Sequence, residues 1–130
     1  FTVTSALAKA AEALSSDENG KRFHVGTVHS KDSFYGETNP ERSAVCGNIM
    51  SRWDSYVRCG CLTSEMECAA IYSVGLVRST YEKKIRCGAV LTALWNAERS
   101  KKNLPDTFCS SSERAITCAI DAIKLLIERD

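Results

Sequence analysis

Residues 61–78 read CLTSEMECAAIYSVGLVR, and the hydrophobic pattern changes within this stretch. Residues 61–65 have the short form of a β-strand, whereas residues 66–78 space their apolar side chains for packing along a helix. Those apolar side chains are Ala69, Ala70, Tyr72, Val74 and Val77. A strand that passes directly into a helix is the repeating unit of α/β proteins.

The segments on either side continue this alternation. Residues 22–30 (RFHVGTVHS) are rich in β-branched and aromatic side chains and predict a strand. Residues 49–57 predict a helix that ends near Gly60. Residues 84–94 (KIRCGAVLTAL) predict the strongest strand of the chain, apolar enough to be buried on both faces of a sheet.

Both ends of the chain are predicted to be helical. Residues 4–14 repeat apolar side chains at helical spacing, with Thr4 or Ser5 as the N-cap and a stop at residues 17–20. Residues 113–128 carry a broad apolar stripe typical of a helix packed on a core. Two segments without periodicity predict loops, residues 31–45 and residues 98–112.

This order of elements predicts the α/β class, with three layers (αβα) in which helices flank a mainly parallel or mixed sheet. Ligands bind such sheets beyond the C-terminal ends of the strands. Phe1 directly precedes the first helix, and a sheet of three strands would leave both edges unpaired. We therefore expect the chain to be part of a larger domain.

Composition argues against nucleic-acid and membrane partners. The 130 residues include 17 basic and 16 acidic side chains, for a net charge of +1. The densest basic cluster, residues 99–102, is short and fits a solvated loop better than a nucleic-acid contact surface. No apolar run reaches the roughly 18 residues that a membrane span needs.

The seven cysteines predict reduced thiols and a cytoplasmic location. Their number is odd and several lie in apolar segments, unlike the paired cysteines of a secreted disulfide scaffold. Cys59 and Cys61, with His24 and His29 upstream, could suggest zinc. One residue between the cysteines is fewer than structural zinc sites use, and no second pair follows, so we expect no metal.

Two carboxylates lie where the strand of residues 61–65 passes into its helix. Glu65 and Glu67 are two positions apart and can point the same way, and a carboxylate there can accept hydrogen bonds from the two hydroxyls of a ribose diol. Met66 between them can lie against the apolar face of a sugar. The structural alternative is that Glu65 caps the helix and Glu67 is a solvated acid of its first turn.

Two aromatic residues follow the strand of residues 22–30. Phe34 and Tyr35 precede Gly36, and an aromatic face at a strand end can stack on a planar base. The alternative is a core aromatic that covers the end of the sheet.

The ordered set of these motifs resembles the uridine phosphorylase type of nucleoside phosphorylase. Residues 26–42 (GTVHSKDSFYGETNPER) resemble its strand and base-binding loop, and residues 60–70 (GCLTSEMECAA) resemble its ribose-binding segment. Residues 86–90 resemble the next strand, and the C-terminal helix fits the last helix of the family. The resemblance covers essentially the whole chain.

The resemblance implies phosphorolysis of a pyrimidine nucleoside, uridine, to free base and ribose 1-phosphate. It implies that Glu67 is the catalytic residue that accepts from the ribose hydroxyls, that Met66 packs against the sugar, and that Glu65 shapes the same pocket. Phe34 would stack near the base, and Arg42 would meet a pyrimidine carbonyl with its planar fork.

Three departures from the family pattern concern the base. Glu37 stands where the base-reading glutamine is expected, and a carboxylate accepts but does not donate. Residues 38–40 lengthen the spacing between Glu37 and Arg42. Asn96 stands where purine phosphorylases and nucleosidases have an aspartate, and an amide cannot protonate a purine nitrogen. The alternatives are a purine phosphorylase or nucleosidase of the same fold, or a non-catalytic member kept for assembly.

The resemblance also sets expectations for partners. It places residues 1–130 in the C-terminal part of a single phosphorylase domain, with the N-terminal half and its phosphate-binding loop and arginines absent. The partners it implies are a nucleoside and phosphate as co-substrate, that N-terminal half, and further copies of the protein in a dimer or hexamer. It implies no cofactor.

Overall fold

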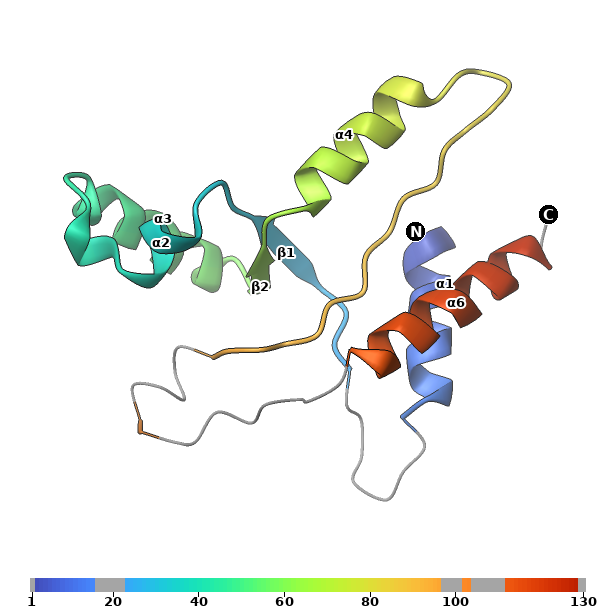
Figure 1. Cartoon of the computed structure of the whole chain (residues 1–130), viewed down its shortest axis with the longest axis horizontal. Helices are drawn as coiled ribbons and strands as arrows, with labels where there is room; N and C mark the ends of the chain where they lie inside the picture. The colour runs from blue at the N-terminus through green and yellow to red at the C-terminus, as the bar shows by residue number, and fades with distance from the viewer. Residues whose placement is uncertain (1, 16–22, 97–101, 104–111, 129–130) are drawn as a thin grey trace. The chain divides into compact units, whose positions relative to one another are not determined.

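The structure is a computed structural model that describes residues 2–15, 23–96, 102–103 and 112–128 (Figure 1). The chain divides into two compact units, one formed by residues 25–85 and the other by residues 1–24 and 86–130. The buried hydrophobic cluster of the described residues lies in the second of these units. No helix among these residues is long and apolar enough to cross a membrane.

The unit of residues 25–85 is a β–α–β–α segment. Its elements are β1 (Thr27–Ser30), α2 (Phe34–Thr38), the 3-10 helix η1 (Pro40–Arg42), α3 (Cys46–Arg58), β2 (Cys61–Glu65) and α4 (Cys68–Arg78). β1 and β2 pair in parallel, which confirms the predicted crossover between them. The strand at residues 61–65 is confirmed, and α3 and α4 confirm the two helices predicted on either side of it.

The parallel register fixes which residues of β1 and β2 lie side by side. His29 pairs with Ser64 and Ser30 pairs with Glu65, after an irregularity between Thr27 and Val28. β1 covers only the last four residues of the strand predicted at residues 22–30. The reason is that β2 has five residues, so the ladder offers no partner further upstream.

α3 ends at the glycine predicted from the sequence. Gly60 has a φ of 80°, in the left-handed region that glycine enters without steric cost. Its N–H donates to the carbonyl of Val57 (3.0 Å), and the N–H of Cys59 donates to the carbonyl of Ser55 (2.9 Å). These two bonds close the last turn of α3 and direct the chain into β2.

The other unit is a pair of helices with a small core. α1 (Thr2–Ala13) packs on α6 (Glu113–Ile127), and both confirm the predicted terminal helices. The buried core consists of small side chains and one leucine: Ala6, Ala10, Cys118, Ala122 and Leu126. Arg114 of α6 also donates to the carbonyl of Leu14 (2.6 Å), which ties the two helices near the end of α1. Thr4 and Ser5 lie inside α1, so the prediction of either as its N-cap was wrong. The predicted stop at residues 17–20 lies outside the described residues.

The third predicted strand does not form. Residues 84–94 run without helix or strand, so the sheet has two strands among the described residues instead of three. Val90 packs against the α1–α6 core, and Gly88 passes so close to Val3 that a β-carbon there would collide with it. The apolar pattern predicted burial, but a strand also needs a neighbouring strand with free backbone groups.

The predicted loop at residues 31–45 contains two short helical segments, α2 and η1. Ser33 begins α2, because its Oγ accepts a hydrogen bond from the N–H of Gly36 (3.0 Å). Pro40 occupies the first turn of η1, where its missing N–H costs nothing. Most of the second predicted loop, residues 98–112, lies outside the described residues.

Candidate functional site

The carboxyl ends of β1 and β2 lie at one edge of the sheet and carry the two predicted binding segments. The N–H of Lys31 donates to the carbonyl of Glu65 (2.8 Å), which extends the ladder one step past β1. The N–H of Ala69 in α4 donates to Oγ of Ser30 (3.1 Å). The loop that begins at Lys31 therefore starts beside residues 65–69, as expected for a ligand site of a parallel sheet.

Glu65 caps the N-terminus of α4. One carboxylate oxygen accepts from the N–H of Glu67 (2.7 Å) and from that of Cys68 (2.6 Å). Burial of Glu65 acts to raise its pKa, but the hydrogen bonds from Cys68 and Glu67, with Ser30 beside them, outweigh this and lower the pKa to about 2. The structural alternative drawn from the sequence is thus confirmed for Glu65, which is ionised and engaged at the helix end.

Glu67 and Met66 are exposed at the same turn. Oε2 of Glu67 accepts from the N–H of Met66 (3.1 Å), a local contact that leaves the side chain of Glu67 at the surface. Met66 is 42% exposed. Because Glu65 supplies the cap, the carboxylate of Glu67 remains accessible beyond the end of β2.

Phe34 opens α2 and presents its ring to the surface. The ring is 52% exposed and meets Tyr35 edge-to-face, with 5.4 Å between ring centroids. Thr38 donates to the carbonyl of Phe34 (3.0 Å), a bond within the same short helix. Within the described residues, Phe34 is therefore not packed in a core.

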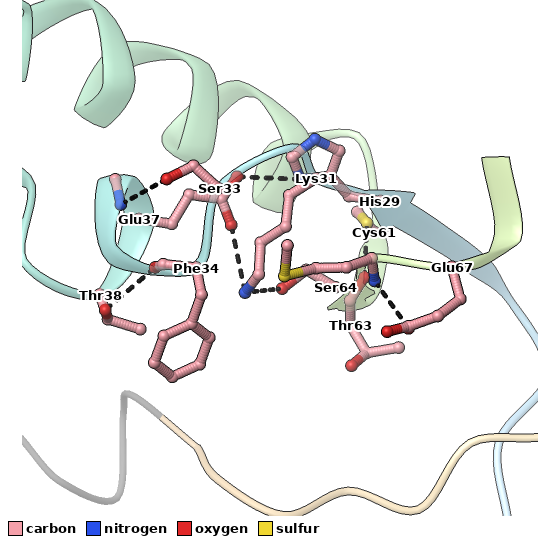
Figure 2. Close-up of polar contacts among 12 residues, drawn as sticks. His29, Lys31, Ser33, Phe34, Glu37, Thr38, Cys61, Thr63, Ser64 and Glu67 are labelled. Carbon is pink, nitrogen blue, oxygen red and sulfur yellow. Dashed lines mark hydrogen bonds and ion pairs between the residues drawn. The ribbon is translucent and has the colours of Figure 1, made fainter. Parts of the chain in front are cut away.

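Glu37 turns toward β1. Its Oε1 lies 3.3 Å from Nδ1 of His29, and its Oε2 lies 3.5 Å from Nζ of Lys31 (Figure 2). Nζ of Lys31 also donates to Oγ of Ser64 on β2 (3.0 Å). His29 packs its ring on Tyr56 of α3, with centroids 4.4 Å apart. These contacts connect α2, α3 and both strands beside the exposed Phe34.

Arg42 lies at the far end of the same loop. It is exposed at the end of η1 and lines a shallow depression of about 340 Å³. The other residues of that depression are Tyr35, Gly36, Asn39 and Ser43. The residues that lengthen the spacing between Glu37 and Arg42 run from the end of α2 through Asn39 into η1.

Comparison with known proteins identifies the family of the chain. The sequence profile of the phosphorylase superfamily matches residues 1–127. The chain belongs to the phosphorylase superfamily. It is 38% identical over 130 residues to a protein named uridine phosphorylase from Treponema pallidum (strain Nichols), and the match covers 100% of this chain and 46% of that relative. The chain therefore spans less than half the length of the curated relative that it matches.

The residues singled out from the sequence of this superfamily member fall in two different units. Six of the seven belong to the unit of residues 25–85, namely Phe34, Glu37, Arg42, Glu65, Met66 and Glu67. Asn96 belongs to the other unit, in the segment after Val90 that has neither helix nor strand. Because Asn96 and the other six residues belong to different units, the role proposed for Asn96 rests on its position in the sequence alone.

The polar contacts of Lys31, His29 and Ser64 were not predicted from the sequence. A signal was present, because His29 and Lys31 are two positions apart and so point to the same face of an extended chain. Ser64 is opposite His29 in the register, which only the pairing of the strands reveals.

The described residues of this phosphorylase superfamily chain contain no group of three or more His, Cys, Asp or Glu suited to a metal ion. Six of the seven cysteines lie in the described parts and are free thiols: Cys46, Cys59, Cys61, Cys68, Cys87 and Cys118. Cys109 lies outside them.

Proposed function

We propose that this chain supplies the ribose and base contacts of a nucleoside phosphorylase that acts on uridine. The observation that carries the proposal is the shared sheet edge, where the exposed Glu67 and the loop of Phe34 begin next to each other on paired strands. The name of the 38% identical relative supports the same substrate.

In the proposed reaction, phosphate attacks the anomeric carbon while the bond from that carbon to the base nitrogen breaks. The sugar passes through a state with oxocarbenium character, and the base leaves with the bonding electrons. Catalysis of such a step depends on holding both reactants in line and on stabilising charge where it develops.

Glu67 holds the sugar in this proposal. Its carboxylate accepts hydrogen bonds from the two ribose hydroxyls, and Met66 lies against the sugar face. Glu65 contributes indirectly, because its ionised carboxylate fixes the first turn of α4 from which Glu67 projects. In this proposal Glu65 has a structural role and Glu67 has the binding role.

Phe34 and Arg42 hold the base. The exposed ring of Phe34 stacks on the pyrimidine, and the guanidinium of Arg42 donates to a carbonyl that gains negative charge as the base departs. Asn96 cannot protonate a leaving group, which suits a pyrimidine that departs as a stabilised anion better than a purine. Phosphate is the co-substrate, no cofactor is required, and the working form is a cytoplasmic homo-oligomer, a dimer or a hexamer.

The test is the Glu67→Gln substitution in the full-length enzyme. Loss of a charge-assisted hydrogen bond typically costs about 1.5–3 kcal/mol, so phosphorolysis of uridine should fall by about one to two decades. The thermal unfolding midpoint should stay unchanged, because Glu65 and not Glu67 caps the helix. Wild-type turnover in Glu67→Gln would remove Glu67 from the site. Glu82→Gln, at another exposed glutamate of the same unit, is the matched control.

Substrate class is tested separately with the wild-type enzyme. Uridine, thymidine and inosine are each incubated with phosphate, and release of free base is measured. We expect turnover of uridine above that of inosine. Preference for inosine would favour the purine alternative, and absence of turnover with all three would favour a non-catalytic member of the superfamily.

A further inference from the structure

Lys31 is the best-connected polar side chain beside the proposed site. It follows β1 directly, and its backbone is held by the 2.8 Å bond to Glu65. Its ammonium lies 3.0 Å from Oγ of Ser64, 3.5 Å from Oε2 of Glu37 and 5.3 Å from the centroid of the Phe34 ring. The side chain is only 11% exposed, which is unusual for a lysine and reflects these partners.

We propose that Lys31 is a positioning residue that fixes the base-stacking face of Phe34 by tying α2 to the sheet. This inference rests on the proposed function, since it gives the Phe34 ring its ligand. Lys31 itself touches neither base nor sugar in the proposal.

One face of α2 lies toward Lys31. Phe34 and Glu37 are three positions apart and therefore share one face of the short helix. Lys31 meets both of them with a single ammonium, by an ion pair to Glu37 and by a cation–π contact to Phe34 (Figure 2).

The two short helical segments of this loop need support from elsewhere in the chain. α2 has five residues and η1 has three, so neither can hold its conformation through its own hydrogen bonds. Neither contributes a buried residue to the core. Contacts with other parts of the chain must therefore stabilise α2. Among the described residues, ion pairs from His29 of β1 and from Lys31, which follows β1, reach α2.

Glu37 is the residue of α2 that forms ion pairs with Lys31 and His29. Its side chain is 16% exposed and faces His29 and Lys31, so its carboxylate is oriented toward the protein. Glu37 thus acts as the anchor of α2, and Lys31 is the counter-charge that holds it. This accounts for a carboxylate at a position where the family resemblance implies an amide that reads the base.

The experiment uses the full-length protein with Lys31→Met, which keeps an unbranched apolar stem and removes the charge. Lys83→Met, at an exposed lysine of the same unit, is the matched control. The first readout is amide hydrogen exchange without ligand. The N–H groups of Asn39, Arg42 and Ser43, which are bonded within the loop, should exchange faster in Lys31→Met and not in Lys83→Met. Unchanged exchange in Lys31→Met would overturn the inference, whatever the activity.

The second readout is steady-state kinetics with uridine and phosphate. KM for uridine should rise by roughly fivefold to tenfold in Lys31→Met, with a smaller change in kcat and no change in KM for phosphate. In a Phe34→Ala background, Lys31→Met should add little further rise, because the ring it positions is already gone. Independent, additive effects would overturn the inference. Wild-type protein without phosphorolysis would refute the proposed function instead, and the exchange experiment would still decide the role of Lys31.

Discussion

At the scale of single residues, Glu65 is a carboxylate held at the end of a helix. Its pKa is lowered from 4.5 to about 2 in the folded chain, because two backbone N–H groups bind the ionised form more strongly than burial disfavours it. A lowered folded-state pKa gives a stabilisation that is complete above the unfolded value of 4.5. That stabilisation is lost as the pH falls from 4.5 toward 2.

The corresponding prediction is a change in the acid profile of stability. Glu65→Gln should unfold more readily than wild type at pH 7, and its free energy of unfolding should depend less steeply on pH between about 4.5 and 2. Urea unfolding of the full-length protein at several pH values measures both effects, with Glu82→Gln as the control. Parallel pH profiles for Glu65→Gln and wild type would show that the ionised cap contributes nothing to folding.

The cysteines offer a second prediction. Burial raises the pKa of the Cys68 thiol, and the hydrogen bond and charge of Glu65 raise it further. Burial and the charge of Asp121 raise the pKa of the Cys118 thiol. Since the thiolate is the reactive form, both should be alkylated at least about tenfold more slowly than the exposed Cys59. Peptide mapping after timed iodoacetamide treatment at pH 8 checks this. Equal rates for the three thiols would contradict the assignment of Cys68 and Cys118 as buried.

At the scale of elements, the sequence predicted what depends on local pattern. The strand at residues 61–65, the end of α3 near Gly60 and the amphipathic α6 all follow from side-chain spacing and turn chemistry. The prediction of a strand at residues 84–94 was wrong, because a strand forms only where another strand, distant in sequence, can pair with it. This segment instead packs Val90 on the two helices. α2 and η1 were missed because each is shorter than the window in which helical periodicity can be recognised.

The candidate site divides in the same way. The positions of Glu65, Glu67 and Phe34 at strand ends followed from the alternation of elements and are found at one sheet edge. The contacts of Lys31 with Ser64 and Glu37 could not be predicted, because they depend on the register of β1 against β2 and on the direction of α2.

The end of α3 gives a prediction for an element boundary. Gly60→Ala should destabilise the protein by about 1–2 kcal/mol, because a β-carbon clashes with the backbone at a positive φ. Gly47→Ala is the matched substitution in the first turn of the same helix, where a β-carbon meets nothing within 4 Å. It should be neutral or stabilising by up to about 1 kcal/mol. Urea unfolding of both variants in the full-length protein measures the contrast, and equal effects would show that the left-handed turn at Gly60 is not maintained in solution.

At the scale of the whole molecule, little of the apolar surface is covered within the described residues. Apart from Leu126 the buried apolar side chains are small, and no large side chain of the described residues is fully buried. α4 leaves Val74 62%, Leu76 77% and Val77 81% exposed. Large apolar side chains exposed along one helix predict contact with further protein.

Residues 1–130 produced alone should therefore behave as an incomplete core. A two-stranded sheet leaves two edges with unpaired backbone groups, and helices apolar on their exposed faces favour association. We expect this polypeptide to bind a hydrophobic dye, to unfold without a cooperative transition, and to lack phosphorolysis of uridine, since none of the proposed contacts holds phosphate beneath the sugar. Co-expression with the remaining sequence of a full-length relative, of which this chain matches 46%, should reduce dye binding and restore turnover. A 130-residue protein that unfolds cooperatively and releases uracil from uridine would instead require a phosphate site within these residues, and Lys31, Arg42 and Arg99 would be the first side chains to substitute.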